Sequence, residues 1–83
     1  MTTHNQLAAV REHLESALQH YFSTLDGHEP VALHEMVHDQ IDIALINVTM
    51  KQAANNQTKV ARLLGISRST LRKKLKQYGM IKA

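Results

Sequence analysis

The sequence predicts an all-α fold of four helices, in which the first two dimerise and the last two form a helix-turn-helix. Apolar residues recur at spacings of three and four, which is the period of a helix. No segment shows the alternation of apolar and polar residues that is typical of a half-buried strand. Glycine or proline lies between the first and second predicted helices and between the third and fourth. We expect two domains, with dimerisation helices in residues 1–55 and a helix-turn-helix in residues 56–83.

The first predicted helix covers residues 5–25. Its apolar side chains form one continuous stripe along one face. They are Leu7, Val10, Leu14, Ala17, Leu18, Tyr21, Phe22 and Leu25. Gly27 follows the stripe, and glycine readily takes the left-handed conformation that ends many helices.

The second predicted helix begins near Pro30, because proline is favoured in a first helical turn, and continues to about Ala54. From Ile41 onward it is apolar around most of its circumference, so it needs cover on several sides. A chain of 83 residues buries only a modest core, which favours a homodimer with this helix at the centre of the interface. The alternative is a wide stripe that the monomer covers by itself. The expected interface residues are Leu14, Leu18, Val37, Ile41, Ala44, Leu45 and Val48.

The last two predicted helices, residues 57–64 and 68–77, each follow a capping residue. The side-chain oxygens of Asn56 and Ser67 can accept a hydrogen bond from a free first-turn amide. Glycine is favoured directly after a helix because it takes positive φ without strain. The glycines that end the two helices are Gly65 and Gly79.

Residues 57–76 have the pattern of a helix-turn-helix. Ala61 is small where the two helices must cross closely, Gly65 allows a positive φ in the tight turn, and Ile66 anchors the turn to the core. The second helix needs a buried face to pack on the first. Its members are Leu71, Leu75 and Tyr78.

Charge divides the chain at residue 55. Residues 56–83 contain eight Lys or Arg and no acid, whereas residues 1–55 contain two basic and seven acidic residues. The charges of the two parts, +8 and 2 − 7 = −5, sum to the formal +3. A compact cationic module on an acidic body is typical of a protein that binds a phosphate backbone. A solvated basic tail is the alternative, but the regular apolar pattern favours a folded module.

In helix-turn-helix proteins the second helix of the motif enters the major groove, with its N-terminal residues nearest to the bases. The face opposite the buried leucines is basic and polar. It carries Ser69, Arg72, Lys73 and Lys76, with Arg68 and Thr70 flanking it. Arg68 and Arg72 suit bidentate hydrogen bonds to guanine, whereas Lys73 and Lys76 suit phosphates. The first-turn amides of both helices are further anion sites.

The composition excludes several classes of function. Cysteine is absent, which excludes disulfides, iron–sulfur clusters and thiol chemistry. The apolar run of residues 41–50 is interrupted by Asp42 and Asn47 and is too short to span a bilayer. The N-terminus lacks a basic segment followed by an apolar one, so we expect a cytoplasmic protein, and no cofactor is expected. Only three aromatic residues are present, which argues against single-strand binding by base stacking.

Residues 34–38, HEMVH, match the H-E-x-x-H pattern of zinc proteases and place two histidines on one helical face. No histidine follows His38, so the pattern lacks a downstream third ligand of that type. Met36 and Val37 are accounted for as core residues. We therefore expect neither a metal site nor an enzyme.

An acidic pair, Asp39 and Asp42, lies on the second predicted helix. We expect a solvated acidic face, or hydrogen bonds from Lys51 or Arg11 across the bundle. In a DNA-bound dimer such acids would keep the body from lying along the DNA.

Residues 55–80 resemble the C-terminal module of the factor for inversion stimulation (Fis) family of bacterial nucleoid proteins. The resemblance rests on NNQTKVARLLGISRSTLRKKLKQYGM and is strongest in its last eleven letters, residues 70–80. It continues more weakly through ALQHYFSTLDG, residues 17–27, and LHEMV, residues 33–37.

The resemblance implies a homodimer in which the first two helices of each chain form a four-helix core. Two helix-turn-helix modules then project with their recognition helices closer together than one turn of DNA, so the DNA bends to engage both. Arg68 would be the main base reader, and Arg72 would assist near the edge of the site. The phosphate contacts that the resemblance implies are Asn56, Thr58, Ser67, Thr70, Lys73 and Lys76.

The sequence departs from the family in three places. The family's longer members begin with a β-hairpin arm that activates DNA invertases, whereas the residues before about Val10 here are predicted helix, so recombinase stimulation is not expected. Ala44 stands where the family often has a kinking proline, which predicts a straighter helix. Gln77 stands where a further lysine is common, which predicts weaker contact with flanking DNA.

The sequence thus predicts a nucleoid-associated regulator of transcription that bends DNA. Its expected partners are double-stranded DNA, a second copy of the chain and RNA polymerase. The alternative is a protein–protein adaptor whose acidic helices dock a partner and whose basic end is a nonspecific anchor. Salt-resistant capture of a partner without DNA would favour the adaptor.

Overall fold

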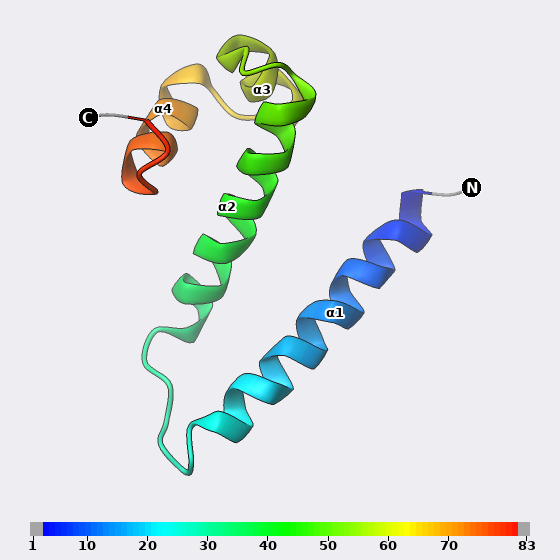
Figure 1. Cartoon of the computed structure of the whole chain (residues 1–83), viewed down its shortest axis with the longest axis vertical. Coiled ribbons are helices and arrows are strands. Elements are labelled where there is room, and N and C mark those ends of the chain that lie inside the picture. The colour runs from blue at the N-terminus through cyan, green and yellow to red at the C-terminus, as the bar shows by residue number, and fades with distance from the viewer. Residues whose placement is uncertain (1–2, 82–83) are drawn as a thin grey trace. The chain divides into compact units, whose positions relative to one another are not determined.

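The computed structural model describes residues 3–81, and within them it contains four helices and no strand (Figure 1). The helices are α1 (Thr3–Thr24), α2 (Leu33–Gln52), α3 (Gln57–Leu64) and α4 (Arg68–Gln77). The predicted all-α fold is therefore confirmed for this part of the chain. None of these helices is both long enough and apolar enough to cross a membrane.

The chain divides into two compact units between Val31 and Ala32. The first unit contains α1, and the second contains α2, α3 and α4. The predicted division, in which residues 1–55 dimerise and residues 56–83 bind DNA, is a division by function and not into compact units. It is not tested by this division and stays a prediction.

α1 carries the predicted apolar stripe and leaves much of it accessible. Leu14 and Leu18 are half-buried. The large apolar residues that are exposed by half or more are Leu7 (60%), Val10 (60%) and Phe22 (50%). The helix ends at Thr24, within one residue of the prediction, and Gly27 takes the expected positive φ of 84°.

α2 begins three residues later than predicted. Ala32, the residue before it, has the left-handed dihedrals φ 53° and ψ 44°, and its side chain makes no capping hydrogen bond. A residue in that conformation cannot continue a right-handed helix back toward Pro30, so the predicted start at Pro30 is wrong. At the other end, Ala54 and Asn55 turn the chain into α3 with φ values of 51° and 65°.

The C-terminal part of α2 shares one core with α3 and α4. The buried side chains of this core are Ile46, Ala53, Val60, Ala61, Leu71 and Leu75. α3 lies across the C-terminal end of α2, and α4 runs back beside it (Figure 1). Because Ile46 belongs to α2 and Ala53 is its C-cap residue, the helix-turn-helix is supported by the helix that precedes it.

Candidate nucleic-acid interface

The first helix of the motif, α3, has the predicted boundaries. The side-chain Oδ1 of Asn56 accepts a hydrogen bond from the backbone N–H of Lys59 at 3.2 Å, which satisfies a free first-turn amide. Gly65 follows the helix with φ 75°, a conformation that glycine adopts without strain. Val60 and Ala61 are buried where the helix packs against its neighbours. The predicted roles of Asn56, Ala61 and Gly65 in the fold are therefore confirmed.

The turn leads directly into a capped α4. The Ile66 N–H donates to the Ala61 carbonyl at 3.0 Å, which closes the turn. The Ser67 Oγ accepts from the Thr70 N–H at 3.1 Å, and the Ser67 hydroxyl donates to the Thr70 Oγ1 at 2.8 Å. These bonds hold both hydroxyl groups at the first turn of α4. Such a turn presents free amides and a positive partial charge to an anion.

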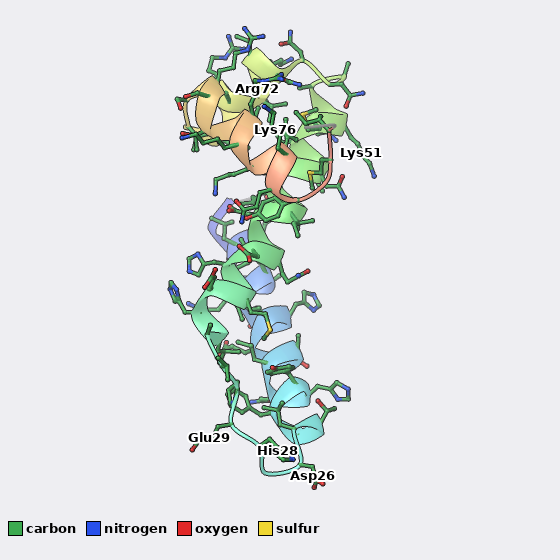
Figure 2. The ribbon with its side chains drawn as sticks, turned by 90° about the vertical axis from the view of Figure 1, so that its left-hand side faces the viewer. Asp26, His28, Glu29, Lys51, Arg72 and Lys76 are labelled. Atoms are coloured by element: carbon green, nitrogen blue, oxygen red, sulfur yellow. The ribbon has the colours of Figure 1, made fainter. Side chains whose placement is uncertain are left out.

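α4 has one buried and one exposed face, as predicted. Leu71 and Leu75 have 0% and 1% of their surface exposed and pack into the core. Arg72 and Lys76 extend from the exposed side of the same helix (Figure 2). The other exposed residues of α4 with predicted contacts to DNA are Arg68 and Lys73. The structure therefore separates the apolar and cationic side chains of α4.

A hydrogen bond that the sequence analysis did not predict joins the two helices of the motif. The Arg72 guanidinium Nη1 donates to the Gln57 Oε1 at 3.0 Å. Gln57 is the first residue of α3, so this bond links the exposed side of α4 to the N-terminal end of α3. No periodicity could reveal this contact, because the two residues lie 15 positions apart and meet only after the turn has formed.

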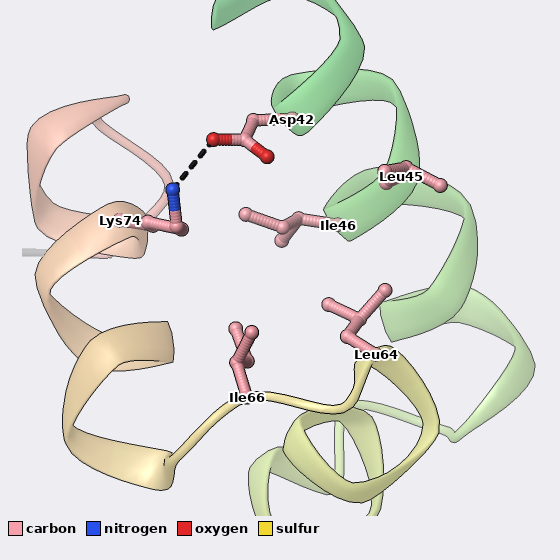
Figure 3. A pocket seen from close by; sticks show the side chains of 6 residues that line it. All are labelled: Asp42, Leu45, Ile46, Leu64, Ile66 and Lys74. Carbon is pink, nitrogen blue, oxygen red and sulfur yellow. Dashed lines mark hydrogen bonds and ion pairs between the residues drawn. The ribbon is translucent and has the colours of Figure 1, made fainter. Parts of the chain in front are cut away.

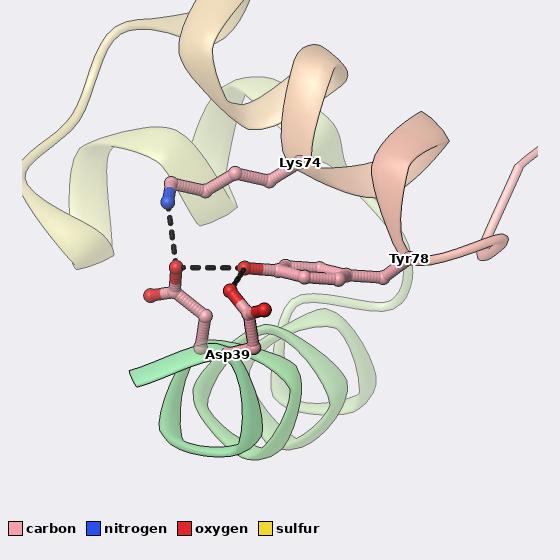
Figure 4. Close-up of polar contacts among 4 residues, drawn as sticks. Asp39, Lys74 and Tyr78 are labelled. Carbon is pink, nitrogen blue, oxygen red and sulfur yellow. Dashed lines mark hydrogen bonds and ion pairs between the residues drawn. The ribbon is translucent and has the colours of Figure 1, made fainter. Parts of the chain in front are cut away.

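The acidic pair of α2 has partners other than those expected. The Lys74 ammonium lies 2.6 Å from the Asp42 Oδ2. The Tyr78 hydroxyl lies 3.0 Å from the Asp42 Oδ2 and 3.2 Å from the Asp39 Oδ1, so its one proton is shared between two carboxylates (Figure 4). The expectation of a solvated face is wrong, because packing brings α4 against this side of α2. The expected bonds from Lys51 or Arg11 across the bundle stay a prediction.

These contacts shift two pKa values. The hydrogen bond from Lys74 lowers the pKa of Asp42 below its ordinary 3.8, although desolvation opposes that change. Burial raises the pKa of Tyr78 to about 12, and the carboxylates of Asp42 and Asp39 add to the rise. At neutral pH, Asp42 is therefore an anion that accepts hydrogen bonds and Tyr78 is a neutral donor.

The two histidines of the H-E-x-x-H pattern do lie together on α2. The rings of His34 and His38 have centroids 4.1 Å apart. Among the described residues, no group of three or more histidines, cysteines or acids is placed to hold a metal ion. A zinc protease needs three protein ligands and an open position, and these two rings do not supply that arrangement.

The residues predicted to contact DNA are accessible at one end of the second unit. All are exposed except Thr70, which is half-buried: Asn56, Thr58, Ser67, Arg68, Thr70, Arg72, Lys73 and Lys76. Asn56 and Thr58 lie at the start of α3, and Ser67 caps α4. Their individual contacts with DNA stay predictions.

The residues predicted to form the dimer interface are also accessible in the single chain. Leu14, Leu18 and Val37 are half-buried. The exposed ones are Ile41, Ala44, Leu45 and Val48. This exposure agrees with a surface that has a partner in an oligomer, and the interface stays a prediction.

Comparison with known proteins gives matches over most of the chain. A family model described as "Bacterial regulatory protein, Fis family" matches residues 39–78. A protein named DNA-binding protein Fis from Glaesserella parasuis is 44% identical over 71 residues, which cover 86% of this chain and 72% of the relative. The protein of the same name from Mannheimia haemolytica has the same identity and coverage. That of Aeromonas hydrophila is 40% identical over 84 residues and covers 95% of this chain and 86% of the relative.

Proposed function

This chain belongs to the Fis family of bacterial regulatory proteins, and from that premise we propose that it binds and bends duplex DNA as a homodimer and regulates transcription. Membership confirms the resemblance that the sequence suggested. It also confirms the expectation that the chain is a DNA-binding regulator and not an enzyme.

The observation that carries the proposal is the separation of the two faces of α4. Its apolar face is buried with the core, while its exposed residues are polar or cationic from the Ser67 cap onward. No acidic residue follows position 55, so no carboxylate on α3 or α4 opposes a phosphate. A helix of this kind, supported on its other side by α2 and α3, is suited to enter a major groove.

Within this proposal the residues of α4 have different tasks. Arg68 lies in the first turn, where a guanidinium reaches base edges and can bond to guanine O6 and N7 together. Arg72 lies one turn further on and is hydrogen-bonded to Gln57. It assists recognition near the edge of the DNA site. Lys73 and Lys76 bind phosphates, and the other proposed phosphate contacts are Asn56, Thr58, Ser67 and Thr70.

A second copy of the chain is the proposed cover for the apolar side of α2. Ile41, Leu45 and Val48 are 38%, 49% and 59% exposed, which is unusual for three large apolar residues on one helix of a small protein. Pairing two chains through these helices would fix the distance between two recognition helices. The resemblance to the family implies that this distance is shorter than one turn of DNA, so that both helices could bind one duplex only if the duplex bends.

The proposed setting follows from the same premise. We place the protein in the cytoplasm, on the nucleoid, with RNA polymerase as a further candidate partner at promoters.

Equilibrium binding of the full chain to a fluorescent duplex, measured at several salt concentrations, tests the proposed function. We expect tight binding at low salt and a linear decrease of log K with log salt concentration. Absence of binding at low salt, by a chain that circular dichroism shows to be helical, would overturn the proposal.

A further inference from the structure

We propose that Asp42 is a positioning residue for DNA recognition, which fixes α4 against α2 by binding Lys74 and Tyr78. Lys74 then positions the recognition helix, α4, and does not bind a phosphate. This inference rests on the proposed function, because it concerns how the DNA-binding helix is held.

The contact joins two acids of α2 to two residues at the C-terminal end of α4. Asp39 and Asp42 lie about one turn apart on α2, while Lys74 lies in the last turn of α4 and Tyr78 is the C-cap residue that directly follows it. The Lys74–Asp42 distance is 2.6 Å, and the Tyr78 hydroxyl approaches both carboxylates at 3.0 and 3.2 Å (Figure 4). Contacts one turn apart on both helices resist rotation of α4 about its own axis as well as its movement away from α2.

A small cavity lies next to this contact. It has a volume of about 80 Å³ and lies among α2, the end of α3, the turn and α4 (Figure 3). The residues that line it are Asp42, Leu45, Ile46, Leu64, Ile66 and Lys74. Side chains beside this space have fewer packing contacts there, so the Lys74–Asp42 ion pair adds a constraint to the buried packing of Leu71 and Leu75. The Lys74–Asp42 ion pair crosses the space at its edge.

The surroundings of Lys74 distinguish it from the other lysines of α4. The Lys74 side chain is 30% exposed, and that of Asp42 is 31% exposed. Lys73 and Lys76, by contrast, are exposed on the side proposed to meet DNA. The lowered pKa of Asp42 agrees with an ion pair that persists at neutral pH. A phosphate that bound Lys74 would have to replace this carboxylate and leave it partly buried without its main partner.

A double-mutant cycle on the full chain tests the inference. Asp42→Asn and Lys74→Met should each reduce the affinity for a duplex about tenfold, and the double variant should lose little more than either single variant. The slope of log K against log salt concentration should stay unchanged in all three. Lys73→Met is the matched comparison, because loss of one phosphate contact should lower the steepness of that slope by about one unit.

The opposite behaviour of Lys74 would overturn the inference. If Lys74 binds a phosphate, Lys74→Met lowers the steepness of the salt slope as Lys73→Met does, and Asp42→Asn raises affinity by releasing the lysine. Variants that bind as tightly as the wild type would also overturn it. Failure of the wild type itself to bind at low salt would instead overturn the proposed function, so the two failures are distinguishable.

Tyr78→Phe keeps the test decisive if Asp42→Asn does not fold. Phenylalanine retains the ring that packs against the core and removes only the hydroxyl that approaches the two carboxylates. We expect a smaller loss of affinity with the same salt slope and an unchanged helical circular dichroism spectrum. Affinity equal to that of the wild type would contradict the positioning role of this cluster. Gln40→Ala, on an exposed part of α2, is the control and should leave binding unchanged.

Discussion

The Arg72 guanidinium donates a hydrogen bond to the Gln57 side chain at 3.0 Å, so the two helices of the DNA-binding motif are joined on their exposed side. Arginine has five N–H donors in a planar fork, and one bond to an amide oxygen leaves others available to a base or phosphate. The contact therefore restricts the orientation of the Arg72 side chain and leaves its other N–H donors available.

Replacing Gln57 by alanine should weaken DNA binding about threefold, because Arg72 would lose the group that orients it. The loss should be greatest for duplexes that differ at the edge of the site. Competition binding with a small set of edge variants measures both quantities. Gln52→Ala, at the exposed C-terminal end of α2, is the control. Identical losses for the two variants would remove the orienting role of Gln57.

Arg68 and Lys73 should respond differently to substitution by alanine. Arg68→Ala should cost about 1–3 kcal/mol for the preferred site and relax the preference at one base position. Lys73→Ala should weaken binding to all duplexes alike and lower the steepness of the salt slope by about one unit. Affinities for matched and mismatched duplexes at several salt concentrations separate the two effects. Equal effects of both variants on every sequence would refute Arg68 as the base reader.

A charge placed on the apolar side of α2 should separate the proposed dimer. Ile41→Glu and Leu45→Glu each put a carboxylate where a second copy would bury an apolar side chain. Sedimentation velocity should show monomers, and DNA bending should be lost because one recognition helix acts alone. Gln40→Glu, with the same added charge at an exposed polar position, should remain dimeric. A folded Ile41→Glu monomer that still bends DNA would contradict this interface.

The Tyr78 cluster should make the stability of the second unit fall at high pH. The folded chain raises the pKa of Tyr78 from 10.0 to about 12, so it favours the neutral phenol. The stabilisation is fully present below the unfolded value and is lost as pH rises from 10.0 to about 12. The midpoint of urea unfolding measures this, and Tyr78→Phe accounts for the titration of other groups. Parallel pH profiles for the wild type and Tyr78→Phe would show that the phenol makes no such contribution.

The boundaries of the two helices of the helix-turn-helix could be predicted because short-range hydrogen bonds determine them. Asn56, Gly65 and Ser67 act through bonds to residues at most a few positions away, so their effect can be inferred from neighbouring residues alone. The start of α2 was missed because Ala32 adopts a left-handed conformation that its residue type does not favour. Nothing in the local sequence signals it.

The contacts of Lys74 and Gln57 were missed for a different reason. Lys74 meets Asp42 across 32 positions, and Tyr78 meets Asp39 across 39, so these contacts depend on how α4 packs against α2. Helical periodicity assigns a residue to a face and does not say which helix that face will meet. The same limit applies to the apolar side of α2. Periodicity predicts that this side is buried, but it does not say which helix or chain buries it.

The measurement that tests the account most directly is a salt titration of the full chain on a set of permuted duplexes, each with one site at a different position. We predict that the mobility of the complex depends on the position of the site. The two lysines of each chain that we propose to bind phosphates, Lys73 and Lys76, predict a slope of log K against log salt of roughly −3.6 or steeper for a dimer. Mobility independent of the position of the site, with a slope half as steep, would contradict a dimer that bends DNA.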